Sequence, residues 1–136
     1  MVTHKTIQLP PFKRGIHLIS KFLTIELTSL PANGLLHIFI KHTSAGLLIN
    51  ENADPDVRSD LEAFLDKMVP ENEPYFKHIL EGPDDMPAHI KNMFTGNSLS
   101  IPIIAGRLGL GTWQGIYLCE FRNQSSSRQI VISIIS

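Results

Sequence analysis

The sequence predicts an α+β fold: one compact domain over residues 1–136, built largely of antiparallel β-sheet layers with two to three helices. Segments with the apolar patterns of strands outnumber segments with helical periodicity. Most of the expected strands are neighbours in the sequence, as in antiparallel sheets. No repeat, low-complexity tract or interdomain linker divides the chain.

The composition excludes several classes of protein. Hydrophobic residues make up 43% of the 136 residues and charged residues 18%, an ordinary globular balance. The net charge of −1 gives no basic excess for binding nucleic acid or an anionic membrane. No apolar run approaches the roughly 20 residues of a membrane span. The single cysteine, Cys119, and the lack of a signal peptide favour a cytoplasmic location.

The first 50 residues contain four of the seven expected strands. Residues 3–10 and 15–20 have strand-like patterns, and the first segment ends in a proline pair. Residues 21–30 mix helical spacing with β-branched residues, and we expect a helix there. Residues 35–42 and 45–50 are two further apolar strands, separated by a short polar interruption.

The clearest helix is expected at residues 54–70. Asp54 can cap its first turn, and Pro55 suits the first helical position. Its apolar residues form one stripe, which consists of Val57, Leu61, Phe64, Leu65 and Met68.

The second half of the chain begins with a polar connection over residues 71–85, with one helical turn expected at residues 76–80. A short helix follows at residues 87–96, with Pro87 early and Gly96 as its C-cap. Three strands complete the chain at residues 98–104, 115–122 and 128–135. The last strand is apolar on both faces, so it lies either at the centre of two layers or against another subunit.

Three of the six histidines occupy positions that suggest a common site. His42 continues the face of Leu36, Ile38 and Ile40 and ends its strand, whereas His78 lies in the polar connection and His89 in the short helix. For any single histidine, a surface position or a hydrogen-bonded core position is the simpler interpretation. Three neutral imidazoles would suit a divalent metal, although no HxH or HExxH motif is present.

Glu120 raises a similar question. It shares a strand face with Ile116 and Leu118, and a carboxylate on an apolar face is costly unless it is paired or binds a metal. Glu120 is therefore either a solvated residue at the strand end, or a buried general base or metal ligand. In the buried case, Glu120→Gln should leave the melting temperature unchanged or raise it. Cys119, on the opposite face, is expected to be a core residue.

A glycine-rich segment at residues 105–115, "AGRLGLGTWQG", precedes the strand that contains Glu120. It matches neither a Walker loop nor a dinucleotide-binding motif. Its glycines would let backbone amides approach an anion, and Arg107 could bind phosphate with two donors. The alternative is a β-connection that only needs positive φ angles.

Several of these segments resemble one family. "HTSAGLLINEN", "MPAHIK" and "LGTWQGIYLCEFR" are similar, in order and spacing, to motifs of the YjbQ-like family, whose members are called secondary thiamine-phosphate synthases. The similarity runs from about residue 34 to the end. One segment departs from the family, because "RNQSSSRQIV" stands where a Gly-Pro-Arg turn is usual.

The resemblance implies a homotrimer with a polar pocket near the subunit interface. His42, His78 and His89 fall on the family's histidine positions, and Glu120 falls on its acidic position. The implied metal ligands are the three histidines, with zinc, manganese or magnesium as the divalent ion. Glu120 and His42 are the expected catalytic residues. The residues expected to bind substrate are Ser44, Asn50, Arg107, Trp113, Gln114 and Arg128, the last of which follows the unusual turn at residues 123–127.

The activity implied by the resemblance joins a hydroxymethylpyrimidine diphosphate to a thiazole phosphate and releases pyrophosphate, as a main or an incidental activity. Two other hypotheses stay open. One is a metal-dependent hydrolase of a phosphorylated metabolite, with Glu120 as the base for the attacking water. The other is a trimeric protein that binds a metabolite or metal without turnover.

Overall fold

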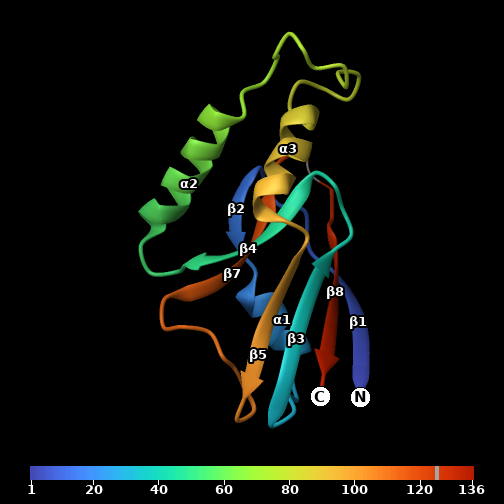
Figure 1. Cartoon of the computed structure of the whole chain (residues 1–136), viewed down its shortest axis with the longest axis vertical. Helices are drawn as coiled ribbons and strands as arrows, with labels where there is room; N and C mark the ends of the chain where they lie inside the picture. Colours follow the sequence, from blue (N-terminus) through green and yellow to red (C-terminus); the bar gives the residue numbers. More distant parts are fainter. Residues whose placement is uncertain (125) are drawn as a thin grey trace.

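A computed structural model describes every residue of the chain except residue 125, and it confirms an α+β fold with two antiparallel sheets and three helices (Figure 1). None of the helices in the part described is long and apolar enough to cross a membrane. The elements, in chain order, are β1 (Val2–Gln8), β2 (Gly15–Leu18), α1 (Ser20–Glu26), β3 (Asn33–Ile40), β4 (Ala45–Glu51), α2 (Pro55–Met68), α3 (Asp85–Thr95), β5 (Ser98–Ile104), β6 (Arg107–Leu108), β7 (Gln114–Glu120) and β8 (Gln129–Ile135).

The strands form a five-stranded sheet in the order β1-β8-β3-β5-β6 and a three-stranded sheet in the order β2-β7-β4. The main core lies between them and includes Leu36 and Ile38 from the larger sheet and Leu47 and Leu118 from the smaller one. Helix α1 contributes Leu23 to the same cluster. β8 pairs with β1 on one side and β3 on the other, so it is an inner strand of its sheet. Only one of its two faces is covered within the chain: Ile130 and Ile132 are buried in the core, whereas Ile135 on the other face is 40% exposed.

The second face of the three-stranded sheet is covered by α2 and α3. Tyr117, Cys119 and Phe121 point to this side and are buried there, packed against Leu61 and Leu65 of α2. The alternation expected for β7 is therefore confirmed, and Cys119 is a core residue. Its burial raises the pKa of the thiol to about 12, which makes it a poor nucleophile.

Helix α2 begins as predicted. The Asp54 side chain accepts a hydrogen bond from the backbone amide of Asp56 at 2.9 Å, and Pro55 is the first helical residue. The predicted apolar stripe is only partly buried, because Phe64 and Met68 are 61% and 41% exposed.

The connection between α2 and α3 differs from the prediction. Residues 76–80 form no helical turn; turns occur at residues 74–75, 80–81 and 83–84 instead. Pro74 and Pro83, which cannot donate a backbone hydrogen bond, lie on either side of this stretch. Helix α3 begins at Asp85, two residues earlier than expected, since a proline is tolerated throughout the first helical turn. This earlier start places Asp85 on the helix.

No helix or strand of the described residues covers the outer face of the five-stranded sheet. Its residues on β1, β8, β3 and β5 include no Asp, Glu, Lys or Arg. Phe39 is 42% and Ile135 40% exposed there, while His4 and His37 make hydrogen bonds to Ser133 and Ser100. An uncharged and partly apolar face of this kind is typical of a subunit interface.

We predict that this face forms the interface of the expected homotrimer. Light scattering at micromolar concentration should give three times the 15.2 kDa mass of one chain. Phe39→Glu should shift the protein toward monomer, because a charge would be buried at the centre of the interface. Ile25→Glu, at a position of α1 that is 70% exposed and away from this face, serves as the control. A monomer mass for the wild type would contradict the prediction.

Candidate functional site

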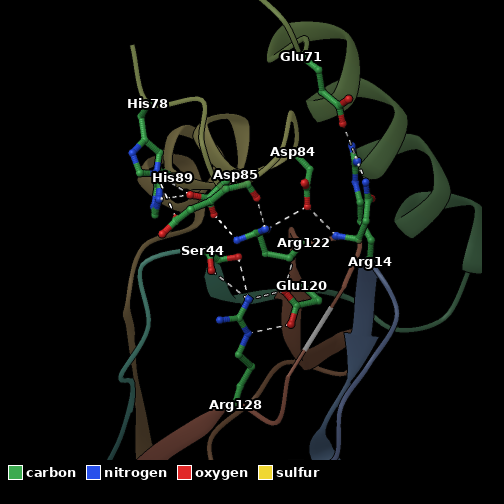
Figure 2. Close-up of polar contacts among 12 residues, drawn as sticks. Arg14, Ser44, Glu71, His78, Asp84, Asp85, His89, Glu120, Arg122 and Arg128 are labelled. Atoms are coloured by element: carbon green, nitrogen blue, oxygen red, sulfur yellow. Dashed lines mark hydrogen bonds and ion pairs between the residues drawn. The ribbon is translucent and has the colours of Figure 1, made fainter. Parts of the chain in front are cut away.

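Two polar clusters meet where α3 begins and where β4, β7 and β8 have their ends (Figure 2). The first, which we call the histidine–aspartate cluster, consists of His78, Glu81, Asp85 and His89. One ligand atom from each of these residues lies within 4.8 Å of the others. The second, the buried ion-pair cluster, consists of Ser44, Glu120 and Arg128.

Asp85 is the centre of the histidine–aspartate cluster. Its side chain is 2% exposed, and one carboxylate oxygen, Oδ1, accepts a hydrogen bond from Nη1 of Arg122. The other oxygen, Oδ2, lies 2.6 Å from Nε2 of His78 and 3.1 Å from Nε2 of His89. Asp85 and His89 are four residues apart on α3, so they share a helix face.

The contacts of His89 determine which of its nitrogens carries a proton. Nδ1 lies 2.9 Å from the carbonyl oxygen of Thr43, which only accepts hydrogen bonds, so Nδ1 is the donor. In the neutral ring, Nε2 is then a bare acceptor that faces the Oδ2 acceptor of Asp85 at 3.1 Å. Two acceptors at this distance repel unless a proton or a cation lies with them. A backbone carbonyl on one nitrogen and a free second nitrogen is also the usual arrangement of a metal-binding histidine.

Asp85 and His78 each favour the charged form of the other. The hydrogen bond to Asp85 raises the pKa of His78 above its ordinary value, with a further contribution from Glu81. Burial opposes ionisation of Asp85, yet hydrogen bonds from His78 and the nearby positive groups hold the pKa of this carboxyl below its ordinary value. The cluster therefore presents an ionised carboxylate to two imidazoles, a ligand set that fits zinc or manganese.

The buried ion-pair cluster holds Glu120 on the core side of β7. Glu120 is fully buried, and its two oxygens accept hydrogen bonds from Nε and Nη2 of Arg128 at 2.8 and 2.6 Å. Nη2 of Arg128 also donates to the hydroxyl of Ser44 at 3.0 Å. The unusual turn before Arg128 includes residue 125, which lies outside the described residues. Of the two interpretations of Glu120, the solvated strand end is wrong, and the carboxylate is buried and paired.

Arg122 joins the two clusters. Its backbone amide donates to Oε2 of Glu120 at 3.2 Å, while its guanidinium donates to Asp84 at 2.9 Å and to Asp85. A third donor reaches the carbonyl oxygen of Glu81 at 2.8 Å. One residue just after β7 therefore fixes the start of α3, the end of the preceding connection and the buried carboxylate.

His42 does not join His78 and His89, which corrects the predicted three-histidine centre within one chain. Its Nε2 accepts a hydrogen bond from the backbone amide of Gln129 at 2.8 Å. Burial and the nearby Arg128 lower the pKa of His42, so its ring is held neutral. In the described part of the chain, His78 and His89 form a group of potential metal ligands with Glu81 and Asp85, and His42 is not a member of it.

Sequence reasoning missed Asp85 because the helix was expected to begin at Pro87. With the helix beginning at Asp85, the spacing of Asp85 and His89 is a recognisable pair of ligands on one helix face. Glu81 lies in the connection before α3, where no periodicity marks its position.

The other predicted substrate-binding residues lie away from both clusters. Asn50 and Gln114 are at the opposite ends of β4 and β7 from Ala45 and Glu120, about 20 Å away along the strands. Their side chains bond locally, to the backbone amides of Glu51 and Gly111 at 2.7 Å each. The side chain of Trp113, the neighbour of Gln114, is 63% exposed.

Arg107 is also distant from the clusters. It pairs with Ile104 at the end of β5 that is farthest from α3, on the outer-face side of the large sheet. A single chain therefore brings together His78, His89, Ser44, Glu120 and Arg128, but not Asn50, Arg107, Trp113 and Gln114.

Comparison with known proteins places this geometry in a family. The family described as "UPF0047 protein YjbQ-like" matches residues 5–136. The "UPF0047 protein YjbQ" of Salmonella typhimurium is 48% identical over 132 residues, which cover 96% of this chain and 95% of that protein. The resemblance drawn from the sequence motifs is confirmed, and it extends into the first 33 residues.

Solved structures agree with the sequence comparison. The conserved hypothetical protein TT1486 from Thermus thermophilus is similar with a TM-score of 0.82 and 34% identity, over 93% of this chain and 97% of that one. An uncharacterized conserved protein of the yjbq/upf0047 family from Clostridium acetobutylicum gives a TM-score of 0.80 and 36% identity, over 98% and 99% of the two chains. The chain belongs to the YjbQ-like (UPF0047) family.

Proposed function

We propose that this chain is an enzyme that binds a divalent metal ion at the histidine–aspartate cluster and acts on a phosphorylated small molecule. The observation that carries the proposal is the contact between Nε2 of His89 and Oδ2 of Asp85, which are both acceptors when the ring is neutral, so that a proton or a cation must lie with them. Imidazole and carboxylate ligands favour zinc or manganese over magnesium, which prefers oxygen ligands alone.

The residues around the cluster hold its ligands in place. Arg122 fixes Asp85, and the carbonyl oxygen of Thr43 fixes the ring of His89. Such outer contacts orient metal ligands and select their protonation state. When bound, the metal would neutralise negative charge on the phosphate oxygens of the substrate.

For the reaction itself, we propose the one that the family resemblance implies: hydroxymethylpyrimidine diphosphate and thiazole phosphate are joined, and pyrophosphate leaves. In this proposal Arg107 and Trp113 contribute from a neighbouring copy, because both are exposed and far from the cluster of their own chain. Arg107 lies at the edge of the outer sheet face that we assign to the trimer interface. In this proposal the site is completed only when the trimer forms, because a neighbouring copy then supplies Arg107 and Trp113.

The hydrolase hypothesis needs a carboxylate that is free to accept a proton. Both oxygens of Glu120 already accept hydrogen bonds, so its predicted catalytic role requires the ion pair to open. His42 would likewise have to release the amide of Gln129. Glu81 is the more available carboxylate, with its side chain 61% exposed.

A pyrophosphate-release assay on metal-loaded protein separates the three hypotheses. Release that requires both the pyrimidine diphosphate and the thiazole phosphate supports the synthase. Release from the diphosphate alone, in water, supports the hydrolase. Absence of release from a protein that binds metal and ligand supports the binding protein and contradicts the proposed reaction.

The proposed metal site predicts the effect of single histidine substitutions. His78→Ala and His89→Ala should each weaken zinc or manganese binding at least about tenfold, because each removes one of few ligands. His42→Ala should bind like the wild type, as should the control His37→Ala on the outer sheet face. Isothermal titration calorimetry of the four variants measures this. Equal binding by all of them would show that the ion, if bound, is held elsewhere.

The raised pKa of His78 predicts how pH acts on the metal-free and metal-bound protein. A proton bound more tightly in the folded state stabilises that state below the ordinary histidine pKa of about 6.5, and this stabilisation is lost as pH rises through the folded-state pKa. Without metal, the melting temperature of the wild type relative to His78→Ala should therefore be higher at roughly pH 6 than at roughly pH 8. With zinc, the order should reverse, because metal must displace the proton. A difference that is independent of pH in both states would contradict the pairing.

The buried ion pair changes the expectation for Glu120. Glu120→Gln removes the charge that compensates the buried Arg128, so we predict a loss of about 3 kcal/mol in the free energy of unfolding rather than an unchanged or raised melting temperature. Denaturant unfolding measures it, with Glu51→Gln as the control, for which a change within about 0.5 kcal/mol is expected. An unchanged stability would mean that Glu120 is held for function alone.

A further inference from the structure

A cavity lies beside the histidine–aspartate cluster, between the connection of residues 69–84 and the first turn of α3. Its volume is about 430 Å³, within the range of small-molecule sites. Much of its lining is apolar, from Phe76, Ile79, Pro83 and Met86. His78 also lines the cavity and belongs to the cluster as well.

The shared histidine connects the cavity to the proposed metal site. Nε2 of His78 lies 2.6 Å from Oδ2 of Asp85, and its ring lies 5.3 Å from the ring of His89. Met86, on the cavity wall, directly follows Asp85 on α3. A ligand that fills the cavity therefore has one end at the cluster.

The charges of the lining determine which part of a ligand the cavity accepts. No Lys or Arg is among the described residues that line the cavity, and the acidic residue Glu73 is among them. An anionic group would be repelled there, whereas an aromatic ring can pack against Phe76 and the adaptable side chain of Met86. The phosphate end of the ligand would have to lie at the cluster, where a metal ion offers positive charge.

The connection that forms the cavity is anchored near both of its ends. Glu71 near its start pairs with Arg14 at 3.2 Å, and the carbonyl oxygen of Glu81 near its end accepts from Arg122 at 2.8 Å. Between these points, the backbone amide of Phe76 donates to the carbonyl of Glu73 at 3.0 Å. The two outer contacts tie the ends of the connection to the rest of the fold, and the local bond shapes the turn that presents Phe76 between them.

From these observations we infer that the cavity binds the ring of an aromatic substrate whose phosphate reaches the histidine–aspartate cluster. The inference rests on the proposed function and adds a ring-binding subsite to it, made by Phe76 and Met86 with Glu73 excluding negatively charged rings. Recognition of the ring thereby belongs to the connection before α3, not to Trp113 of the same chain.

The test compares three phosphonates on the zinc-loaded wild-type protein by calorimetry. Phenylphosphonate should bind about tenfold more tightly than methylphosphonate, a conservative fraction of the gain from burying one ring. 4-Carboxyphenylphosphonate should lose this advantage because its second charge faces Glu73, and Glu73→Gln should restore part of it. Equal binding of phenyl- and methylphosphonate to the wild type overturns the inference.

Neighbouring residues provide matched controls. Phe76→Ala should abolish most of the preference for the phenyl ring, whereas Tyr75→Ala, at a side chain that is 74% exposed, should retain it. On α3, Met86→Ala should reduce the preference, and Met93→Ala, 80% exposed, should not. Phe76→Leu, which keeps an apolar side chain, should give an intermediate value. The same effect for Phe76→Ala and Tyr75→Ala overturns the inference.

Zinc binding is titrated separately, so failure of the metal site and failure of the cavity are distinguishable. If zinc does not bind, the proposed metal centre is wrong, and the ring preference is then measured on the metal-free protein with benzyl alcohol against methanol. Saturable benzyl alcohol binding that Phe76→Ala removes keeps the cavity as a ring-binding site. If zinc does not bind and the metal-free protein also shows no saturable binding of benzyl alcohol, the inference is overturned together with the metal centre.

Discussion

The burial of one carboxylate, that of Asp85, constrains much of the structure around it. An ionised group with 2% side-chain exposure must have both oxygens compensated, and it does: Arg122 donates a hydrogen bond to Oδ1, and Nε2 of His78 lies within hydrogen-bond distance of Oδ2. Arg122 must then stay where its guanidinium reaches Asp85, which also brings its backbone amide to Glu120. The start of α3, the end of the preceding connection and the end of β7 are thus fixed by the requirement to satisfy one buried charge.

The two-sheet architecture explains why this chemistry lies where it does. β7 is the central strand of the small sheet, with buried neighbours on both faces, so its interior is available only for packing. Polar groups collect where β7 ends, at Glu120 and Arg122, and where β4 begins, at Ser44. A rigid scaffold with polar strand ends is a common way to hold a site in a fixed geometry.

Much of the fold could be predicted from the sequence because its signals are local. The alternation in β7 separates Cys119 from Glu120, and the Asp54–Pro55 pair marks the start of α2, both within a few residues. The site could be predicted only in part, because its decisive contacts join distant segments. His42 bonds to Gln129, 87 residues away, and Arg128 reaches Ser44 across 84 residues. No periodicity encodes these pairings. The loop position of Glu81 and the helix start at Asp85 likewise depend on Arg122, which lies in another part of the chain.

The distribution of arginines connects the three proposals made for this chain: a metal ion, a phosphorylated ligand and a trimer. Arg14, Arg122 and Arg128 are ion-paired within the chain, and Arg58 lies 5.5 Å from the ring of Tyr117. Arg107 is exposed on β6, at the far end of the chain from the cluster and beside the outer sheet face. A phosphorylated ligand at an acidic cluster needs positive charge from outside these existing pairs. The proposed metal ion would supply part of it, and an arginine from a neighbouring copy in the proposed trimer would supply the rest. On this proposal, a monomer that folds correctly would still hold an incomplete site.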